Sequence, residues 1–200
     1  MKKIIAFEGM PGTGKTTLIR KIIEKNLLKR CIGISQLELS QQLCSLNNDL
    51  MMSKLYLDAE RQKSNKISGL FKKCDYILLD RTFLTTLAYC YARSKIKKDK
   101  AQYLRLLDYF KQLGEKGFFI KPTCIICFLL PIKESISRRS RFSKIDEYHY
   151  WFDPEFLDYF SKFYSKENLA KFKIPKIIFI NVSKLNKADL VKKIIKIIYI

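Results

Sequence analysis

The sequence predicts an α/β protein built on a five-stranded parallel sheet, with helices on both faces. Apolar runs that lack polar alternation recur along the 200 residues and are separated by segments with helical periodicity. Strands that are apolar on both faces are typical of a parallel sheet buried between two helical layers. A glycine-rich stretch directly follows the first run, at the carboxyl end of a strand, where such sheets bind ligands.

Each expected element follows from the spacing of its apolar residues. The predicted strands are 3–7, 31–35, 76–80, 124–130 and 176–182. The predicted helices are 16–30, a mostly helical region at about 37–71, 83–96, 99–115 and a closing amphipathic helix from residue 187. Neither a repeat nor a composition break divides the chain, which indicates one domain over residues 1–200.

Composition limits the class of protein. The sequence has no window of about 18 uncharged apolar residues, so we expect no membrane-spanning helix and no membrane partner. The six cysteines lie mostly in apolar runs, which is typical of reduced core residues in a cytoplasmic protein. The formal net charge of +20 would suit a polyanion, but the lysines are scattered along the whole chain, so a nucleic-acid partner is not expected.

The stretch from Gly9 to Thr16 matches the phosphate-binding motif G-x-x-x-x-G-K-[ST], placed between a strand and a helix. Its glycines let the backbone turn N–H groups inward, where they and the positive end of the helix cradle phosphates. Lys15 is expected to reach the β- and γ-phosphates, and Thr16 to ligate Mg²⁺. The motif therefore predicts binding of ATP with Mg²⁺, through Gly9, Met10, Pro11, Gly12, Thr13, Gly14, Lys15, Thr16 and Thr17.

Charged residues also stand at the carboxyl ends of two strands. Asp80 ends a buried strand and is expected to hold Mg²⁺, directly or through water. Arg81 follows it and would pair with a phosphate of the acceptor. Glu8, at the end of the first strand, has two interpretations: a general base toward an acceptor hydroxyl, or a buried structural acid.

Three arginines follow the fourth predicted strand. Arg138, Arg139 and Arg141 lie in a segment at about 137–152 that we interpret as a lid. A transferring phosphoryl group needs positive charge around its oxygens, and arginines that close over it would supply that charge. The alternative interpretation is a solvated basic helix.

With these motifs in place, the chain resembles the thymidylate kinase branch of P-loop nucleoside and nucleotide kinases. FEGMPGTGKTT is similar to the F-E-G-x-D-G-x-G-K-T-T opening of that family, and LLDRTFLTTLAYCYA to its D-R-Y-x-x-S-x-x-A-Y-Q segment. LYLDAER is similar to its L-L-F-A-A-D-R segment, and LLPIKESISRRSR to its passage from strand to lid. The resemblance runs over most of the chain. It implies a P-loop three-layer sandwich with strand order 2-3-1-4-5, and a homodimer.

The resemblance also implies roles for individual residues. Arg81 would hold the 5′-phosphate of the acceptor, Arg61 would reach its base, and the lid arginines would close on ATP. Tyr56 and Tyr89, together with Glu8, complete the expected acceptor-binding set. The leading function is therefore phosphorylation of dTMP by ATP.

Four departures from the family pattern fall on the acceptor side and none on the ATP side. Pro11 replaces the loop acid that contacts the sugar, Leu57 stands where an aromatic residue would stack on the base, and Cys90 replaces a glutamine. The R-E-P-G segment after the second strand is missing. Related deoxynucleoside kinases share the apolar residue at position 11 and also lack R-E-P-G. A deoxynucleoside kinase with Glu8 as base therefore stays open, and a nucleic-acid-stimulated ATPase is a distant alternative.

Overall fold

The computed structural model describes residues 2–35, 49–70, 72–140 and 150–199. In this part of the chain, five strands form one sheet in the order β2-β3-β1-β4-β5, and every neighbouring pair is parallel. The parallel sheet and its strand order confirm the prediction. The strands are β1 (Lys3–Gly9), β2 (Cys31–Ile34), β3 (Tyr76–Asp80), β4 (Cys124–Leu129) and β5 (Ile177–Asn181).

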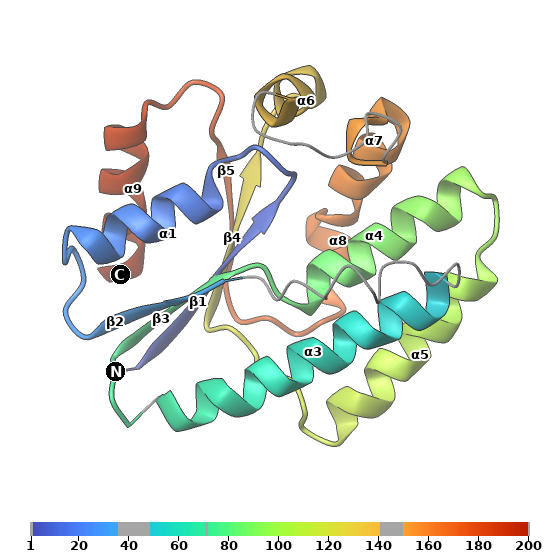
Figure 1. The fold of residues 1–200 in the computed structure, drawn as a ribbon, viewed down its shortest axis with the longest axis horizontal. Helices are drawn as coiled ribbons and strands as arrows, with labels where there is room; N and C mark the ends of the chain where they lie inside the picture. The colour runs from blue at the N-terminus through green and yellow to red at the C-terminus, as the bar shows by residue number, and fades with distance from the viewer. Residues whose placement is uncertain (1, 36–48, 71, 141–149, 200) are drawn as a thin grey trace.

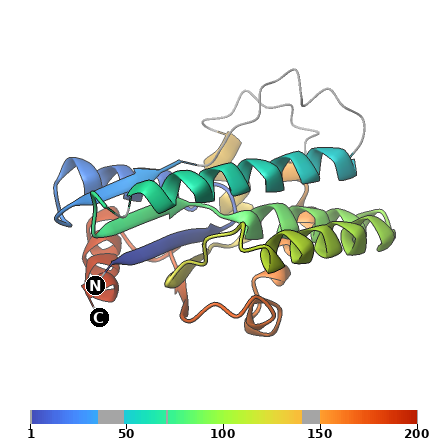
Figure 2. The same cartoon turned by 90° about the horizontal axis from the view of Figure 1, so that it is seen from below.

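Helices cover both faces of the sheet. Figure 1 shows α1 and α9 on one side and α3, α4 and α5 on the other, and in Figure 2 the last three run side by side past the strands. No helix within the described ranges is long and apolar enough to cross a membrane. The helices are α1 (Lys15–Glu24), α3 (Asp49–Leu70), α4 (Phe83–Ile96), α5 (Ala101–Glu115), α6 (Ile132–Ser140), the 3-10 helix η1 (Tyr150–Phe152), α7 (Pro154–Phe163), α8 (Lys166–Ala170) and α9 (Lys187–Tyr199).

The central strand β1 is buried along almost its whole length. Its side chains from Ile4 to Glu8 are at most 4% exposed, and the Phe7 ring packs on that of Phe128 with centroids 5.8 Å apart. Burial on both faces accounts for the unbroken apolar run in the sequence. The strand runs two residues beyond its predicted end, because Glu8 and Gly9 pair with Cys127 and Phe128 of β4.

Helix α1 is shorter than the predicted 16–30. It ends at Glu24, and the chain then turns at Asn26, whose φ is 48° and whose N–H donates to Ile23 O at 3.0 Å. Leu28 follows the turn and is buried at 3% exposure. The apolar residues after Glu24 therefore reach the core through a turn, although their spacing had indicated a longer helix.

The other elements lie close to their predicted bounds. The helix predicted at 83–96 is α4, and the one predicted at 99–115 begins at Ala101, whose N–H donates to Asp99 Oδ1 at 2.8 Å. Residues 37–48 and residue 71 of the predicted helical region lie outside the described residues, and residues 49–70 form α3. None of the five cysteines in the described ranges forms a disulfide; three of them are buried and two half-buried.

The surroundings of two glycines, Gly9 at the end of β1 and Gly69 in α3, predict opposite effects of their substitution by alanine. Gly9 has a φ of 114°, and a Cβ there would lie 2.3 Å from Phe128 O, so Gly9→Ala should lower the free energy of unfolding by at least ~2 kcal/mol. Gly69 lies in α3 with open space around it, so Gly69→Ala should raise that free energy by about 0.5–1 kcal/mol. Urea unfolding of both variants measures this difference. Equal unfolding midpoints would contradict the close approach of Gly9 to β4.

Candidate active site

The loop between β1 and α1 has the backbone that an anion cradle requires. Gly9, Gly12 and Gly14 all have positive φ angles, of 114°, 73° and 86°. A Cβ on Gly12 would lie 3.0 Å from Ser135 O, so this position also needs a glycine to let α6 approach. Gly14 caps α1 without a side-chain hydrogen bond, and the first helical turn has no acid. The N–H groups at this helix end therefore face an open site that favours negative charge.

Lys15 folds back over this loop. Its Nζ donates to Met10 O at 2.8 Å, Thr13 Oγ1 at 2.8 Å and Gly9 O at 3.1 Å. Burial, and next the positive charge of Arg81, hold the pKa of Lys15 well below its usual value. The ammonium group thus lies at the centre of the loop, where a bound anion would stabilise its charged form.

Thr16 and Asp80 meet at the carboxyl ends of β1 and β3. The Thr16 hydroxyl donates to Asp80 Oδ2, which brings together the two residues predicted to hold Mg²⁺. A hydroxyl and a carboxylate are oxygen ligands of the kind that Mg²⁺ takes, so the pair fits the ion. Within the described ranges no group of three or more acidic, histidine or cysteine residues forms a metal site. Phosphate oxygens and water would therefore have to supply the remaining ligands.

Hydrogen bonds hold both the backbone and the side chain of Arg81. Its backbone has a left-handed φ of 67°, its N–H donates to Phe7 O at 3.1 Å, and its side chain is buried at 8% exposure. The guanidinium Nη1 donates to Gly9 O at 3.0 Å and to Thr85 Oγ1 at 3.2 Å. The predicted phosphate-binding arginine is thus held against the phosphate loop.

Glu8 is fully buried and accepts four hydrogen bonds. Its Oε1 accepts from the Thr82 N–H and hydroxyl, both at 2.7 Å. Its Oε2 accepts from the hydroxyls of Thr85 at 2.7 Å and Tyr164 at 2.9 Å. Both oxygens are engaged by donors from α4 and from the end of α7, as in a structural acid. Tyr164 carries no sequence signal for this role, since it lies 156 residues from Glu8.

The arginines that we predict to belong to a lid have different surroundings. Arg138 pairs with Glu134 at 2.5 Å and donates weakly to Gly12 O at 3.5 Å. Arg139 lies over the rings of Trp151 and Phe152, at 5.9 and 5.8 Å, and its buried Nε has no hydrogen-bond partner among the described residues. Arg141 lies outside the described residues.

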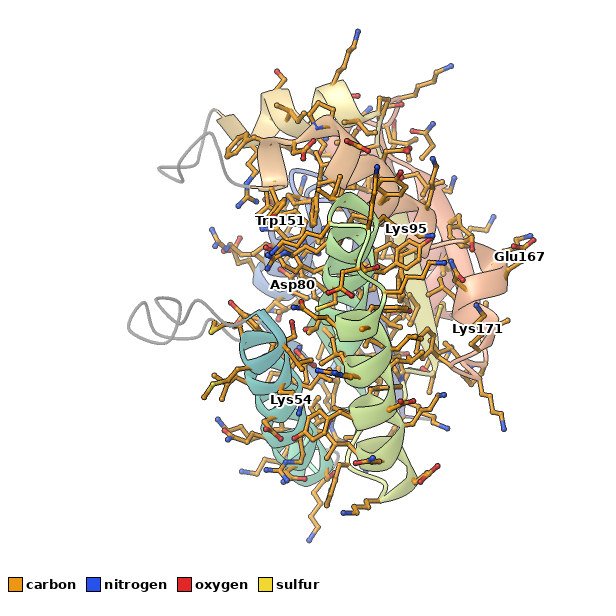
Figure 3. All side chains as sticks on the ribbon, turned by 90° about the vertical axis from the view of Figure 1, so that its right-hand side faces the viewer. Lys54, Asp80, Lys95, Trp151, Glu167 and Lys171 are labelled. Atoms are coloured by element: carbon orange, nitrogen blue, oxygen red, sulfur yellow. The ribbon has the colours of Figure 1, made fainter. Side chains whose placement is uncertain are left out.

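The electrostatics connect Arg139 with the site. Burial, followed by the charge of Arg81, lowers the pKa of Arg139. In Figure 3, Trp151 and Asp80 are both seen between α3 and α6. Arg139 lies over the ring of Trp151. Arg139 is therefore the described lid arginine that feels the charge at the centre of the site.

The residues expected on the acceptor side have different surroundings. Arg61 Nε lies 3.7 Å from Asp58, and its guanidinium covers the Phe118 ring at 5.4 Å, on the side of α3 that faces α5. Tyr89 packs against aromatic rings of η1 and α7, among them Trp151 at 5.4 Å. Tyr56 lies half-buried on α3.

The buried hydroxyl of Tyr164 predicts a pH-dependent contribution to stability. Burial, and next the charge of Glu8, raise the pKa of Tyr164 well above 10.0. Its hydrogen bond therefore stabilises the protein fully below the pKa of an unfolded tyrosine, and this stabilisation is lost as the pH rises above that value. Tyr164→Phe should cost about 1.5–3 kcal/mol at pH 8, and less above about pH 10.

Urea unfolding between pH 7 and pH 10.5 measures this difference, with Tyr199→Phe as a control because Tyr199 is 60% exposed. A cost of Tyr164→Phe that is independent of pH, or equal to that of Tyr199→Phe, would contradict the assignment.

Comparisons with known proteins agree with this geometry. The profile of the NB-ARC domain, a P-loop NTPase family, matches residues 1–96. A probable thymidylate kinase 1 of Saccharolobus solfataricus is 28% identical over 145 residues, which cover 69% of this chain and 70% of that protein.

Solved structures share the fold over nearly the whole chain. A deoxyadenosine kinase from M. mycoides with bound dATP superposes with a TM-score of 0.75 at 20% identity, covering 100% of both chains. A thymidylate kinase from Candida albicans superposes with a TM-score of 0.71 at 16% identity, covering 99% of this chain and 91% of that one. The chain is therefore similar in sequence and in fold to P-loop kinases of nucleosides and nucleotides, which confirms the resemblance, the fold and the enzyme class predicted from the sequence.

Proposed function

We propose that the protein transfers the γ-phosphoryl group of ATP to a deoxynucleoside monophosphate, with dTMP as the leading acceptor. The observation that carries this choice is the bonding of Glu8, whose two oxygens already accept four hydrogen bonds. A sugar hydroxyl needs a base to take its proton, whereas a phosphate monoester has a second pKa near 6 and is already anionic at pH 7. A monophosphate acceptor therefore needs no base at the Glu8 position.

In this mechanism the protein positions the substrates and neutralises their charge. The loop N–H groups and the N-terminus of α1 bind the phosphates of ATP. Lys15 exchanges its bonds to Gly9 O and Met10 O for phosphate oxygens. Arg81, held by the loop and by Thr85, receives the 5′-phosphate of the acceptor.

Thr16 and Asp80 would hold Mg²⁺, which supplies charge neutralisation between the β- and γ-phosphates. The residues themselves keep their oxygens at the mouth of the loop. The hydrogen bond from the Thr16 hydroxyl to Asp80 brings these two oxygens close enough to bind one ion.

Arg139 is the lid arginine that we assign to the transferring phosphoryl group. Its unpartnered Nε and its interaction with the charge of Arg81 both favour an anion between the two guanidinium groups. Arg138, by contrast, already pairs with Glu134, and its hydrogen bond to Gly12 O supports the phosphate loop. The single domain with a lid at about 137–152, the homodimer and the cytoplasmic location stay predictions.

A deoxynucleoside kinase is the second candidate. The ion pair of Arg61 with Asp58, at 3.7 Å, would compete with the base contact implied by the thymidylate kinase pattern. Pro11 also lacks the acid that this pattern has in the loop. The likeness to deoxyadenosine kinase, over the full length of both chains, favours the same candidate.

The acceptor choice predicts the result of an ADP-release screen with Mg·ATP. Each of the four deoxynucleosides and its monophosphate is offered separately, and turnover is expected with a monophosphate, dTMP first. Arg81→Ala should raise the KM for that acceptor at least ~10-fold, because a charge-assisted pair is lost, and change the KM for ATP far less. Turnover of nucleosides alone, abolished in Glu8→Gln, would instead support the second candidate.

The contrast between the two described lid arginines gives a further prediction. Arg139→Ala should lower kcat by about 10²–10³-fold, because it removes charge from the transition state. Arg138→Ala is the matched control on the same helix and should lower kcat by less than about 10-fold, since Arg138 bonds Glu134. Steady-state kinetics at saturating ATP and acceptor measure both, and equal losses would contradict the assignment.

A further inference from the structure

Helix α3 contains a buried lysine that reaches the backbone of Arg81. Lys63 is 2% exposed, and its Nζ donates to Arg81 O at 2.9 Å and to Glu60 Oε1 at 3.2 Å. The sequence motifs described above assign this lysine no role, and the phosphate-transfer mechanism does not use it.

The carbonyl that Lys63 holds belongs to a residue with an unfavourable backbone. Arg81 has a φ of 67°, a left-handed conformation that is unfavourable for a residue with a Cβ. Its N–H is bonded to Phe7 O of β1, and its C=O to the ammonium group of Lys63. The two bonds hold the residue from opposite sides, so the direction of the guanidinium group depends on both.

The Glu60–Lys63 pair is a poor means of stabilising a core. Its side chains are 13% and 2% exposed, and removing two charges from water costs more than an apolar pair of similar volume would. The pair therefore needs another reason, and the Arg81 carbonyl supplies one. A lysine can donate to Glu60 and to Arg81 O together, which no apolar side chain can do.

We propose that Lys63, oriented by Glu60, is a positioning residue for Arg81. It touches neither substrate. It fixes the left-handed peptide of Arg81 so that the guanidinium group faces the acceptor phosphate. The inference rests on the proposed role of Arg81 in binding the acceptor, which Arg81→Ala tests independently.

The test compares Lys63→Met with Lys66→Met, a control on the exposed side of the same helix. Loss of a hydrogen bond from a charged donor predicts that Lys63→Met raises the KM for the acceptor about 10-fold, with the KM for ATP changed less than about 2-fold. Lys66→Met should leave both constants unchanged. If Lys63→Met does not fold, Lys63→Arg keeps the charge but alters the donor geometry, and it should raise the same KM by a smaller factor.

A double-mutant cycle separates positioning from general stability. If Lys63 acts through Arg81, the KM for the acceptor in Lys63→Met/Arg81→Ala should equal that of Arg81→Ala alone. A lower melting temperature with an unchanged KM, or effects on KM that simply multiply, would overturn the inference. An unaffected KM in Arg81→Ala would instead overturn the proposed role of Arg81, and the inference with it.

Discussion

The buried carboxylate of Glu8 is the interaction on which the site depends. A charged group without solvent exposure requires donors in place of water, and Glu8 has four of them. They come from Thr82 and Thr85, at the start of α4, and from Tyr164, just after α7. The carboxylate thereby ties the end of β1 to two helices that lie 74 and 156 residues further along the chain. Together with their packing in the core, this one group helps to fix the positions of those helices relative to the phosphate loop.

The position of Arg81 depends on the hydrogen bonds of Glu8. The Thr85 hydroxyl donates to Glu8 and so presents a lone pair to the Arg81 guanidinium, while the phosphate loop accepts through Gly9 O. Lys63 adds the third support from α3. Contacts with β1, α4 and α3 therefore fix the position of Arg81 together. A side chain held in this way loses little conformational entropy when it binds a phosphate, which is the general advantage of a preorganised site.

The sequence was informative where function depends on local backbone. Gly9 to Thr16 required one strand, one turn and one helix, and their order could be predicted from spacing alone. Asp80 could be predicted as well, because carboxyl ends of parallel strands meet at one edge. Tyr164 and Lys63 could not, since each acts through a partner far away in the sequence and looks like any residue of an amphipathic helix. The contrast between Arg138 and Arg139 could not be predicted either, because it depends on their contacts with Glu134 and Trp151.

The overall charge of the chain is a weaker guide than the location of a few cations. Most of the net charge of +20 comes from lysines that are scattered along the sequence, where water and salt screen them. Lys15 and Arg139, by contrast, are each destabilised in their charged form by burial and by the charge of Arg81. Phosphates that bind beside these two cations would favour their charged forms, and this would contribute to phosphate binding. The cations that the proposed phosphoryl transfer needs are therefore the few buried ones near Arg81, and not the scattered lysines that give the chain its net charge.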